Sequence, residues 1–232
     1  MDQRICCVRG VVLDIDGTLV DTNDAQAYSW VQAMHEYEYE VDFDTVRPLI
    51  GMGGDKVLPE TLHIAKDSDI GQKISKRRKE IFKTQYLPRV HALPGAFDLL
   101  QHMYNRGLRL VIATSAEADE LQGLLGVIGE HADQFFEKQT SSQDAQKSKP
   151  DADIMQVALQ RSGLSAQELV MLGDTAYDIQ AAQQVHIPTI AFRSGGWSDQ
   201  DLQGAIAIYD DPLDLLQHFD QSPLANQQQH PV

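Results

Sequence analysis

Short apolar runs separated by helical patterns are the feature that most constrains how this chain can fold. The runs are four to six residues long, contain β-branched side chains, and lie at residues 11–15, 108–113, 169–172 and 187–192. Such runs are typical of strands buried on both faces. Apolar residues at helical spacing occupy 97–104 and 154–158, and Gly107 and Gly163 follow as helix terminators. The alternation predicts a doubly wound α/β fold around a parallel sheet, with a weaker strand at 135–139.

A long helical stretch interrupts this alternation after the first strand. About 65 residues precede the helix that begins near Pro94, and apolar spacing predicts helices around 27–34 and 70–86. We therefore expect a Rossmann-like core with an inserted α-helical cap domain. The expected boundaries are 1–20 and 92–220 for the core, 21–91 for the cap, and 221–232 for a disordered C-terminal tail rich in glutamine.

The composition excludes several classes of function. The 232 residues include 19 Lys and Arg against 34 Asp and Glu, and the resulting net charge of -15 disfavours binding to nucleic acid or an anionic membrane. The two cysteines, Cys6 and Cys7, are adjacent, which excludes a disulfide framework and favours a reducing compartment. Because no apolar run approaches about 18 residues, we predict a cytoplasmic protein without a membrane span. The sequence does not indicate an oligomeric state.

Carboxylates follow two of the predicted strands. Asp14 and Asp16 come at the end of the first strand, where Gly17 lets the chain turn away, and Asp174 and Asp178 follow the strand at 169–172. Ligands of open α/β sheets bind at this edge. Carboxylates gathered there would repel one another unless a cation lay among them, and hard oxygen ligands suit Mg²⁺. The alternatives are an Asp-Gly turn for the first pair and a favourable helix-start charge for Asp178.

Three further residues suit an anionic substrate. Thr114 and Ser115 follow the strand at 108–113, where hydroxyl and backbone N–H groups can hold phosphate oxygens, although a helix cap explains them equally well. Lys149 precedes a predicted helix start, a position that the helix dipole disfavours for a cation, so an anion is expected beside it. Lys147 competes for the same role.

At these residues the sequence resembles the haloacid dehalogenase-like hydrolase superfamily. The four motifs of that superfamily occur in order as Asp14–Asp21, Thr114, Lys149 and Gly173–Asp178. The helical insertion resembles the cap of the first subclass, which includes members similar to phosphoglycolate phosphatase and β-phosphoglucomutase. Leu49–Lys56 resembles the loop that such caps lower onto the substrate, so Gly51 and Lys56 are expected to contact it.

The resemblance implies a phosphatase mechanism that uses Mg²⁺. Asp14 would attack phosphorus and form an aspartyl-phosphate, and Asp16 would act as general acid and then general base. Thr114, Ser115 and Lys149 would bind the phosphoryl oxygens. The metal ligands implied by the resemblance are Asp14, Asp16, Asp174 and Asp178.

Departures from the motifs separate the branches of the superfamily. Dehalogenases and phosphonatases lack the second carboxylate of the first motif, whereas Asp16 is present here. Gln26 stands where the similar mutases usually carry a histidine, so hydrolysis of a small phosphomonoester is favoured over mutase activity. The alternatives are a sugar-phosphate mutase, a nucleotide phosphatase and a regulatory binding module without turnover. Ala152 replaces a frequent proline, which affects helix entry rather than chemistry.

The basic residues of the predicted helix at 73–83 have two interpretations. They form a solvated helix face, or they attract phosphorylated substrates or an acidic partner. The solvated face is the favoured interpretation.

Overall fold

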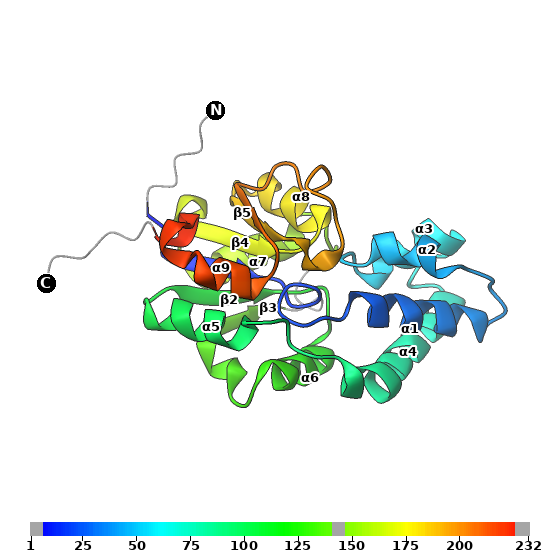
Figure 1. The fold of residues 1–232 in the computed structure, drawn as a ribbon. Helices are drawn as coiled ribbons and strands as arrows, with labels where there is room; N and C mark the ends of the chain where they lie inside the picture. The colour runs from blue at the N-terminus through cyan, green and yellow to red at the C-terminus, as the bar shows by residue number, and fades with distance from the viewer. Residues whose placement is uncertain (1–6, 141–146, 226–232) are drawn as a thin grey trace, which may run out of the picture.

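A single sheet of six parallel strands organises the molecule (Figure 1). The computed structural model describes residues 7–140 and 147–225. The sheet order is β3-β2-β1-β4-β5-β6. The strands are β1 (Gly10–Leu13), β2 (Arg109–Ala113), β3 (Phe136–Thr140), β4 (Leu169–Gly173), β5 (Thr189–Phe192) and β6 (Ala207–Tyr209). The predicted doubly wound α/β fold is therefore confirmed.

Two details of the strands differ from the prediction. β1 ends at Leu13 rather than residue 15, so Asp14 already lies in the loop beyond the strand. β6 was not predicted, because its three residues, Ala207–Tyr209, are partly exposed at the edge of the sheet and form no continuous apolar run. The weak strand predicted at 135–139 is present as β3, one residue later.

Alternate strand residues supply the two buried faces of the sheet. On one face, Val11 and Leu13 of β1 belong to a hydrophobic cluster that includes Leu99 of α5 and Leu121 of α6. On the other face, Val12 packs in a cluster with residues of α7 and α8. This alternation follows from the period of two along a strand, and it gives a three-layer arrangement with helices on both sides.

Nine α-helices lie in the described part of the chain. They are α1 (Asn23–His35), α2 (Phe43–Val46), α3 (Gly54–Leu62), α4 (Asp69–Ile81), α5 (Ala96–Asn105), α6 (Ala118–Ile128), α7 (Asp153–Ser162), α8 (Ala176–Gln184) and α9 (Pro212–Gln217). Local chemistry explains several of their ends. Ser68 caps α4 by accepting the N–H of Gly71 at 3.2 Å. None of these helices combines the length and hydropathy that crossing a bilayer requires.

Helices α1 to α4 form a group beside the carboxyl ends of the strands (Figure 1). They share their own hydrophobic cluster, which includes Trp30, Met34, Leu58 and Ile74. A π-helical turn at Phe82–Tyr86 continues α4 toward the sheet. We call residues 21–91 the cap segment. Its boundaries as a separate domain stay a prediction.

The basic face at 73–83 is only partly solvated. Three of its residues, in α4 and the π-helical turn after it, pair with acidic residues in or directly before α6, which covers the sheet. The ion pairs are Arg78 with Glu120, Lys79 with Glu117, and Lys83 with Asp119. The favoured interpretation was wrong for Arg78 and Lys79, because their acidic partners belong to the same chain and lie about 40 positions away in the sequence. Lys83 pairs with Asp119 but is exposed, as a solvated face predicts.

The C-terminal tail begins later than predicted. Short 3₁₀ helices cover Phe219–Gln221 and Pro223–Ala225, and Leu224 is fully buried in the cluster that includes residues of α5 and α9. The sequence prediction failed here because one leucine among polar residues carries no periodic signal. Residues 226–232 lie outside the described part of the chain.

Candidate active site

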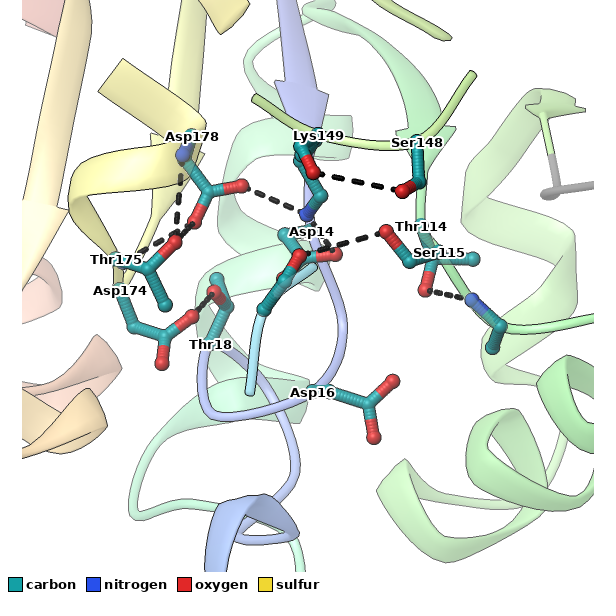
Figure 2. A network of polar contacts seen from close by, with 12 residues as sticks. Asp14, Asp16, Thr18, Thr114, Ser115, Ser148, Lys149, Asp174, Thr175 and Asp178 are labelled. Atoms are coloured by element: carbon teal, nitrogen blue, oxygen red, sulfur yellow. Dashed lines mark hydrogen bonds and ion pairs between the residues drawn. The ribbon is translucent and has the colours of Figure 1, made fainter. Parts of the chain in front are cut away.

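Two central strands of the sheet end in acidic residues. β1 and β4 are neighbours, with Leu13 opposite Leu172. The chain continues from β1 toward β2 on one side and from β4 toward β5 on the other. Such a reversal opens a crevice at the carboxyl ends of the strands. Asp14 and Asp174 each follow one of these strands, so both reach this crevice (Figure 2).

Three carboxylates meet in the crevice. Asp14, Asp174 and Asp178 each offer one oxygen within 4.8 Å of the other two, and no side chain of the three is more than 2% exposed. Among the described residues, the carboxylate of Asp16, the fourth predicted metal ligand, is not part of this cluster. The structure therefore brings three of the four predicted carboxylates together.

Burial shifts the protonation of Asp14 and Asp174. It is the largest cause that raises the pKa of Asp174 to about 7; the charge of Asp178 adds to it, and a hydrogen bond from Asn23 opposes it. Burial also raises the pKa of Asp14 well above its ordinary value, against the opposing charge of Lys149. Carboxylates in this state release protons readily when a cation binds.

Lys149 lies between two of the carboxylates (Figure 2). Its Nζ is 2.9 Å from Oδ1 of Asp14 and 2.7 Å from Oδ1 of Asp178. Burial lowers the pKa of Lys149, but the two charges outweigh it and raise the pKa above the ordinary value. Lys149 is therefore a charged lysine at neutral pH. The competing Lys147 is exposed, and its backbone N–H donates to Asp153 at 3.1 Å.

Asp178 also begins α8. Its Oδ2 accepts the N–H of Thr175 at 3.1 Å and the Thr175 hydroxyl at 2.7 Å, which completes a capping box. The helix-start interpretation of Asp178 and its place beside Lys149 are thus compatible, because each uses a different oxygen.

The loop after β1 and the first residue of α1 hold Asp174. Thr18 Oγ1 donates to Asp174 Oδ1 at 3.0 Å, and Asn23 Nδ2 donates to Oδ2 at 2.8 Å. Gly17 has a φ of +73°, and a Cβ at this position would lie 2.1 Å from Asp174 Oδ2. Only glycine fits here, because a side chain would displace the carboxylate.

Asp16 is held by the cap segment. Its Oδ1 accepts the Thr22 hydroxyl at 2.6 Å and Nε2 of Gln26 at 2.8 Å. The same Gln26 nitrogen donates to Glu120 of α6 at 2.9 Å, while Arg78 donates to Gln26 Oε1 and to Glu120. Because arginine only donates, the orientation of the Gln26 amide is fixed, and its NH₂ group faces Asp16.

The predicted phosphate-binding residues have different positions. Thr114 is fully buried, and its Oγ1 accepts the N–H of Ala116 at 3.1 Å. This bond lies in the turn before α6, whose N-cap is Glu117, so Thr114 does not cap the helix. Ser115 is partly buried and its hydroxyl lies 3.4 Å from the carbonyl oxygen of Gly51 in the cap loop. That contact brings the predicted cap loop against the strand end.

A cavity of about 580 Å³ lies between the crevice and the cap segment. Its lining from the sheet side includes Asp14, Asp16, Ser115 and Lys149, and Gly51 lines it from the cap loop. Lys56, the other predicted cap contact, does not line this cavity. Its ammonium pairs instead with Asp151 at 2.5 Å, so it joins the cap loop to the segment after Lys149.

The sequence of this site also matches a known family. Residues 11–192 match the family model of haloacid dehalogenase-like hydrolases, and this range contains every residue of the site described in this section. The chain belongs to this family. The predicted family and the prediction of a hydrolytic enzyme are confirmed.

Relatives of this haloacid dehalogenase-like hydrolase match along most of their length. The chain is 25% identical to the pyrophosphatase PpaX of Oceanobacillus iheyensis, covering 84% of this chain and 86% of the relative. It is 26% identical to the phosphoglycolate phosphatase of Escherichia coli strain K12, covering 90% and 91%. The crystal structure of a hydrolase from Pseudomonas syringae superposes with a TM-score of 0.84 at 27% identity, covering 91% and 98%.

The carboxylate cluster of this hydrolase fits a divalent cation. All donors are hard oxygens, which Mg²⁺ and Ca²⁺ prefer. Asp14 Oδ1 is buried and, apart from its ion pair with Lys149, receives no hydrogen bond from the described residues. A cation among Asp14, Asp174 and Asp178 would supply positive charge that balances these three buried carboxylates.

Sequence reasoning missed the residues that hold the predicted ones. Thr18 and Asn23 stand close to the first motif, where their polar side chains beside a strand end were a usable signal. Gln26 was compared with a histidine, but its contact with Asp16 was not foreseen. Arg78 and Glu120 carried no signal for this site, because they lie on separate helices that only the tertiary fold brings together.

Proposed function

We propose that this chain is a Mg²⁺-dependent phosphatase that hydrolyses small phosphomonoesters through an aspartyl-phosphate intermediate. One observation carries the proposal: Asp14 and Asp16 line the same cavity but have different surroundings. Asp14 is buried beside Lys149, and Asp16 is hydrogen-bonded by Thr22 and Gln26 outside the carboxylate cluster. Carboxylates in different environments suit different roles.

In the first step, a carboxylate oxygen of Asp14 attacks phosphorus. The phosphorus–oxygen bond of the ester breaks, and the leaving oxygen takes a proton from Asp16. The products are an alcohol and an aspartyl-phosphate. The hydrogen bonds from Thr22 and Gln26 engage only Oδ1 of Asp16, so its other oxygen remains available to carry the proton.

In the second step, water attacks the aspartyl-phosphate. Asp16, now ionised, accepts a proton from this water, and the bond between phosphorus and the Asp14 oxygen breaks. Inorganic phosphate leaves, and both aspartates return to their starting states. Splitting the hydrolysis into two displacements lowers the barrier of each.

The surrounding residues neutralise and orient the phosphoryl group. Lys149 provides a fixed positive charge beside Asp14, and Ser115 with the backbone N–H groups before α6 offers hydrogen bonds to phosphoryl oxygens. Thr114 would join them if its hydroxyl turned from Ala116. Positioning of this kind is the main contribution of a protein to phosphoryl transfer.

Asp14 and Asp174 would hold the Mg²⁺ ion, with Asp16 contributing its backbone carbonyl. Asp178 would act mainly by holding Lys149, because its Oδ1 forms an ion pair with that lysine and its Oδ2 completes the capping box of α8. When bound, the ion neutralises the charge that develops on the phosphoryl oxygens.

The relatives support a small phosphorylated substrate. Their names describe one as a pyrophosphatase and another as a phosphoglycolate phosphatase. The cavity of about 580 Å³ is large enough for a phosphoryl group with a small leaving group. The adjacent cysteines, Cys6 and Cys7, favour action in a reducing compartment, the cytoplasm.

Phosphate release from a panel of esters tests the proposal. We expect release from phosphoglycolate, hexose phosphates or nucleotides to require Mg²⁺ and to fall at least about 10³-fold in Asp14→Asn, which keeps the size of the side chain but removes the nucleophile. Circular dichroism of the variant checks that it folds. Full activity of Asp14→Asn would exclude the aspartyl-phosphate.

The acid role of Asp16 has a separate test. In Asp16→Asn, we expect a large loss with alkyl phosphates and a small one with an aryl phosphate, because an activated leaving group needs little protonation. Equal losses with both substrates would instead assign Asp16 a binding role.

A further inference from the structure

The cap side of the cavity contains hydrogen-bond donors that lack partners. Ser75, on α4, is 7% exposed, and its Oγ has no hydrogen-bond partner in the described part of the chain. The same holds for Nε of Arg78, one turn further along the helix. Both residues line the cavity. Buried polar atoms normally have partners, because leaving one unpaired costs free energy. This wall is therefore short of acceptors.

Lys66 adds a positive charge to the same wall. It lines the cavity, is partly buried, and forms no ion pair with any described residue. A Cβ built on Gly54 would lie 3.8 Å from Cε of Lys66 and 3.0 Å from the ring of Trp30. The lysine stem therefore lies beside the backbone of Gly54 and close to Trp30, which keeps its ammonium at the cavity.

No carboxylate near these donors forms an ion pair with Lys66 in the described part of the chain. Glu120 pairs with Arg78 and Glu117 with Lys79, while Asp55 accepts the N–H of Ser148 at 3.2 Å. Asp67 lines the cavity too, but it is exposed to solvent. Because Arg78 is paired with Glu120 and Lys79 with Glu117, Lys66 is the cation of this wall that has no ion-pair partner among the described residues and can bind a ligand.

On the basis of the proposed phosphatase function, we infer that this wall binds a second oxyanion, a carboxylate or a phosphate, on the leaving group of the substrate. Lys66 and Ser75 are its specificity residues. The phosphoryl group lies at Asp14, and the oxyanion at the opposite wall accepts hydrogen bonds from the Lys66 ammonium and the Ser75 hydroxyl. A neutral leaving group leaves these donors unpaired, so the site discriminates against it.

Two matched pairs of substrates test the inference. Phosphoglycolate and 2-hydroxyethyl phosphate differ only in a terminal carboxylate or hydroxyl, and fructose 1,6-bisphosphate and fructose 6-phosphate differ in a second phosphate. In at least one pair, we expect kcat/KM to be about tenfold or more higher for the compound with the second oxyanion, which is phosphoglycolate or fructose 1,6-bisphosphate. This is the effect of a charge-assisted hydrogen bond. The pair with the larger ratio identifies the oxyanion.

Substitution of Lys66 locates this preference. In Lys66→Met, we expect the ratio of kcat/KM values within the favoured pair to fall to about twofold. The change should come mainly from a higher KM for the compound with the second oxyanion, while the compound without it is unaffected. Lys66→Arg retains the preference, and Ser75→Ala lowers it a few-fold. Lys76→Met is the matched control, because Lys76 is an exposed lysine of α4 outside the cavity.

Binding separates this inference from the proposed function. Calorimetric titration of the same four compounds into Asp14→Asn with Mg²⁺ compares affinities without turnover. If wild type releases no phosphate from any ester, the proposed function fails, and the affinities still decide the inference. Equal affinity within both pairs, or a preference that survives in Lys66→Met, overturns it.

Discussion

At the centre of the site, Lys149 lies 2.9 Å from Asp14 and 2.7 Å from Asp178, and all three side chains are almost completely buried. A buried ion pair is worth little relative to an apolar replacement of both partners, but removing one partner leaves an uncompensated charge. The lysine therefore matters for folding as well as for binding phosphate. The two contributions can be separated by measuring stability and activity together.

We expect Lys149→Met to lower the free energy of unfolding by about 3 kcal/mol in metal-free buffer, because Asp14 and Asp178 lose their common counter-ion. Phosphatase activity should be lost as well. Urea denaturation measures the first effect. Lys147→Met, two residues away and exposed, is the control and should change stability by less than about 0.5 kcal/mol. Equal stabilities for the two variants would contradict the assigned role of Lys149.

Between elements, the row of ion pairs from α4 to α6 connects the cap segment to the sheet. Its members differ strongly in exposure: Arg78 and Glu120 are 14% and 2% exposed, whereas Lys83 and Asp119 are 41% and 64% exposed. The inner pair also contacts Gln26, which donates to Asp16. The inner pair is therefore expected to dominate the energetics of this contact.

Arg78→Met should lower the free energy of unfolding by about 3 kcal/mol, since it leaves Glu120 buried without its cation. Lys83→Met, in the π-helical turn that continues α4, should cost less than about 1 kcal/mol, because its pair is exposed and screened by water. Chemical denaturation of both variants measures the difference. A loss of similar size in both would show that burial does not distinguish the two pairs.

For the whole molecule, the buried carboxylates make stability depend on metal and pH together. The pKa of Asp174 is raised from 3.8 to about 7 in the folded protein, mainly by burial. Between these values the folded chain holds a proton that the unfolded chain has released. By linkage, this group makes the metal-free protein less stable as pH rises from about 4 to about 7, and its effect levels off above that.

We therefore expect the melting temperature to be higher with Mg²⁺ than in buffer with EDTA. The difference between the two melting temperatures should increase from pH 5 to pH 8, because fewer protons compete with the ion for the carboxylates. Differential scanning calorimetry at several pH values measures it. Asp174→Asn removes the titrating group, so its difference should be smaller and less dependent on pH. A wild-type melting temperature that is unaffected by Mg²⁺ throughout this range would argue against a metal site here.

The sequence alone determined the sheet and the positions where acidic residues leave it. Strands such as 169–172 were predicted because burial on both faces requires continuous apolar runs, and Asp14 and Asp174 were found because they directly follow such runs. These are local properties, fixed by the covalent order of the chain. Thr114 and Lys149 were singled out by their places at a strand end and a helix start, and the family resemblance then implied their roles.

The tertiary structure alone decided which side chains meet. Arg78 and Glu120 are 42 residues apart, and Thr18 and Asp174 are 156 apart, yet each pair is in hydrogen-bond contact. It also directed Lys56 toward Asp151 and away from the cavity, and placed Lys66 at the cavity with no ion-pair partner among the described residues. The physical reason is that such contacts depend on how helices pack against the sheet, which is set by the buried surface of the whole molecule rather than by any local pattern.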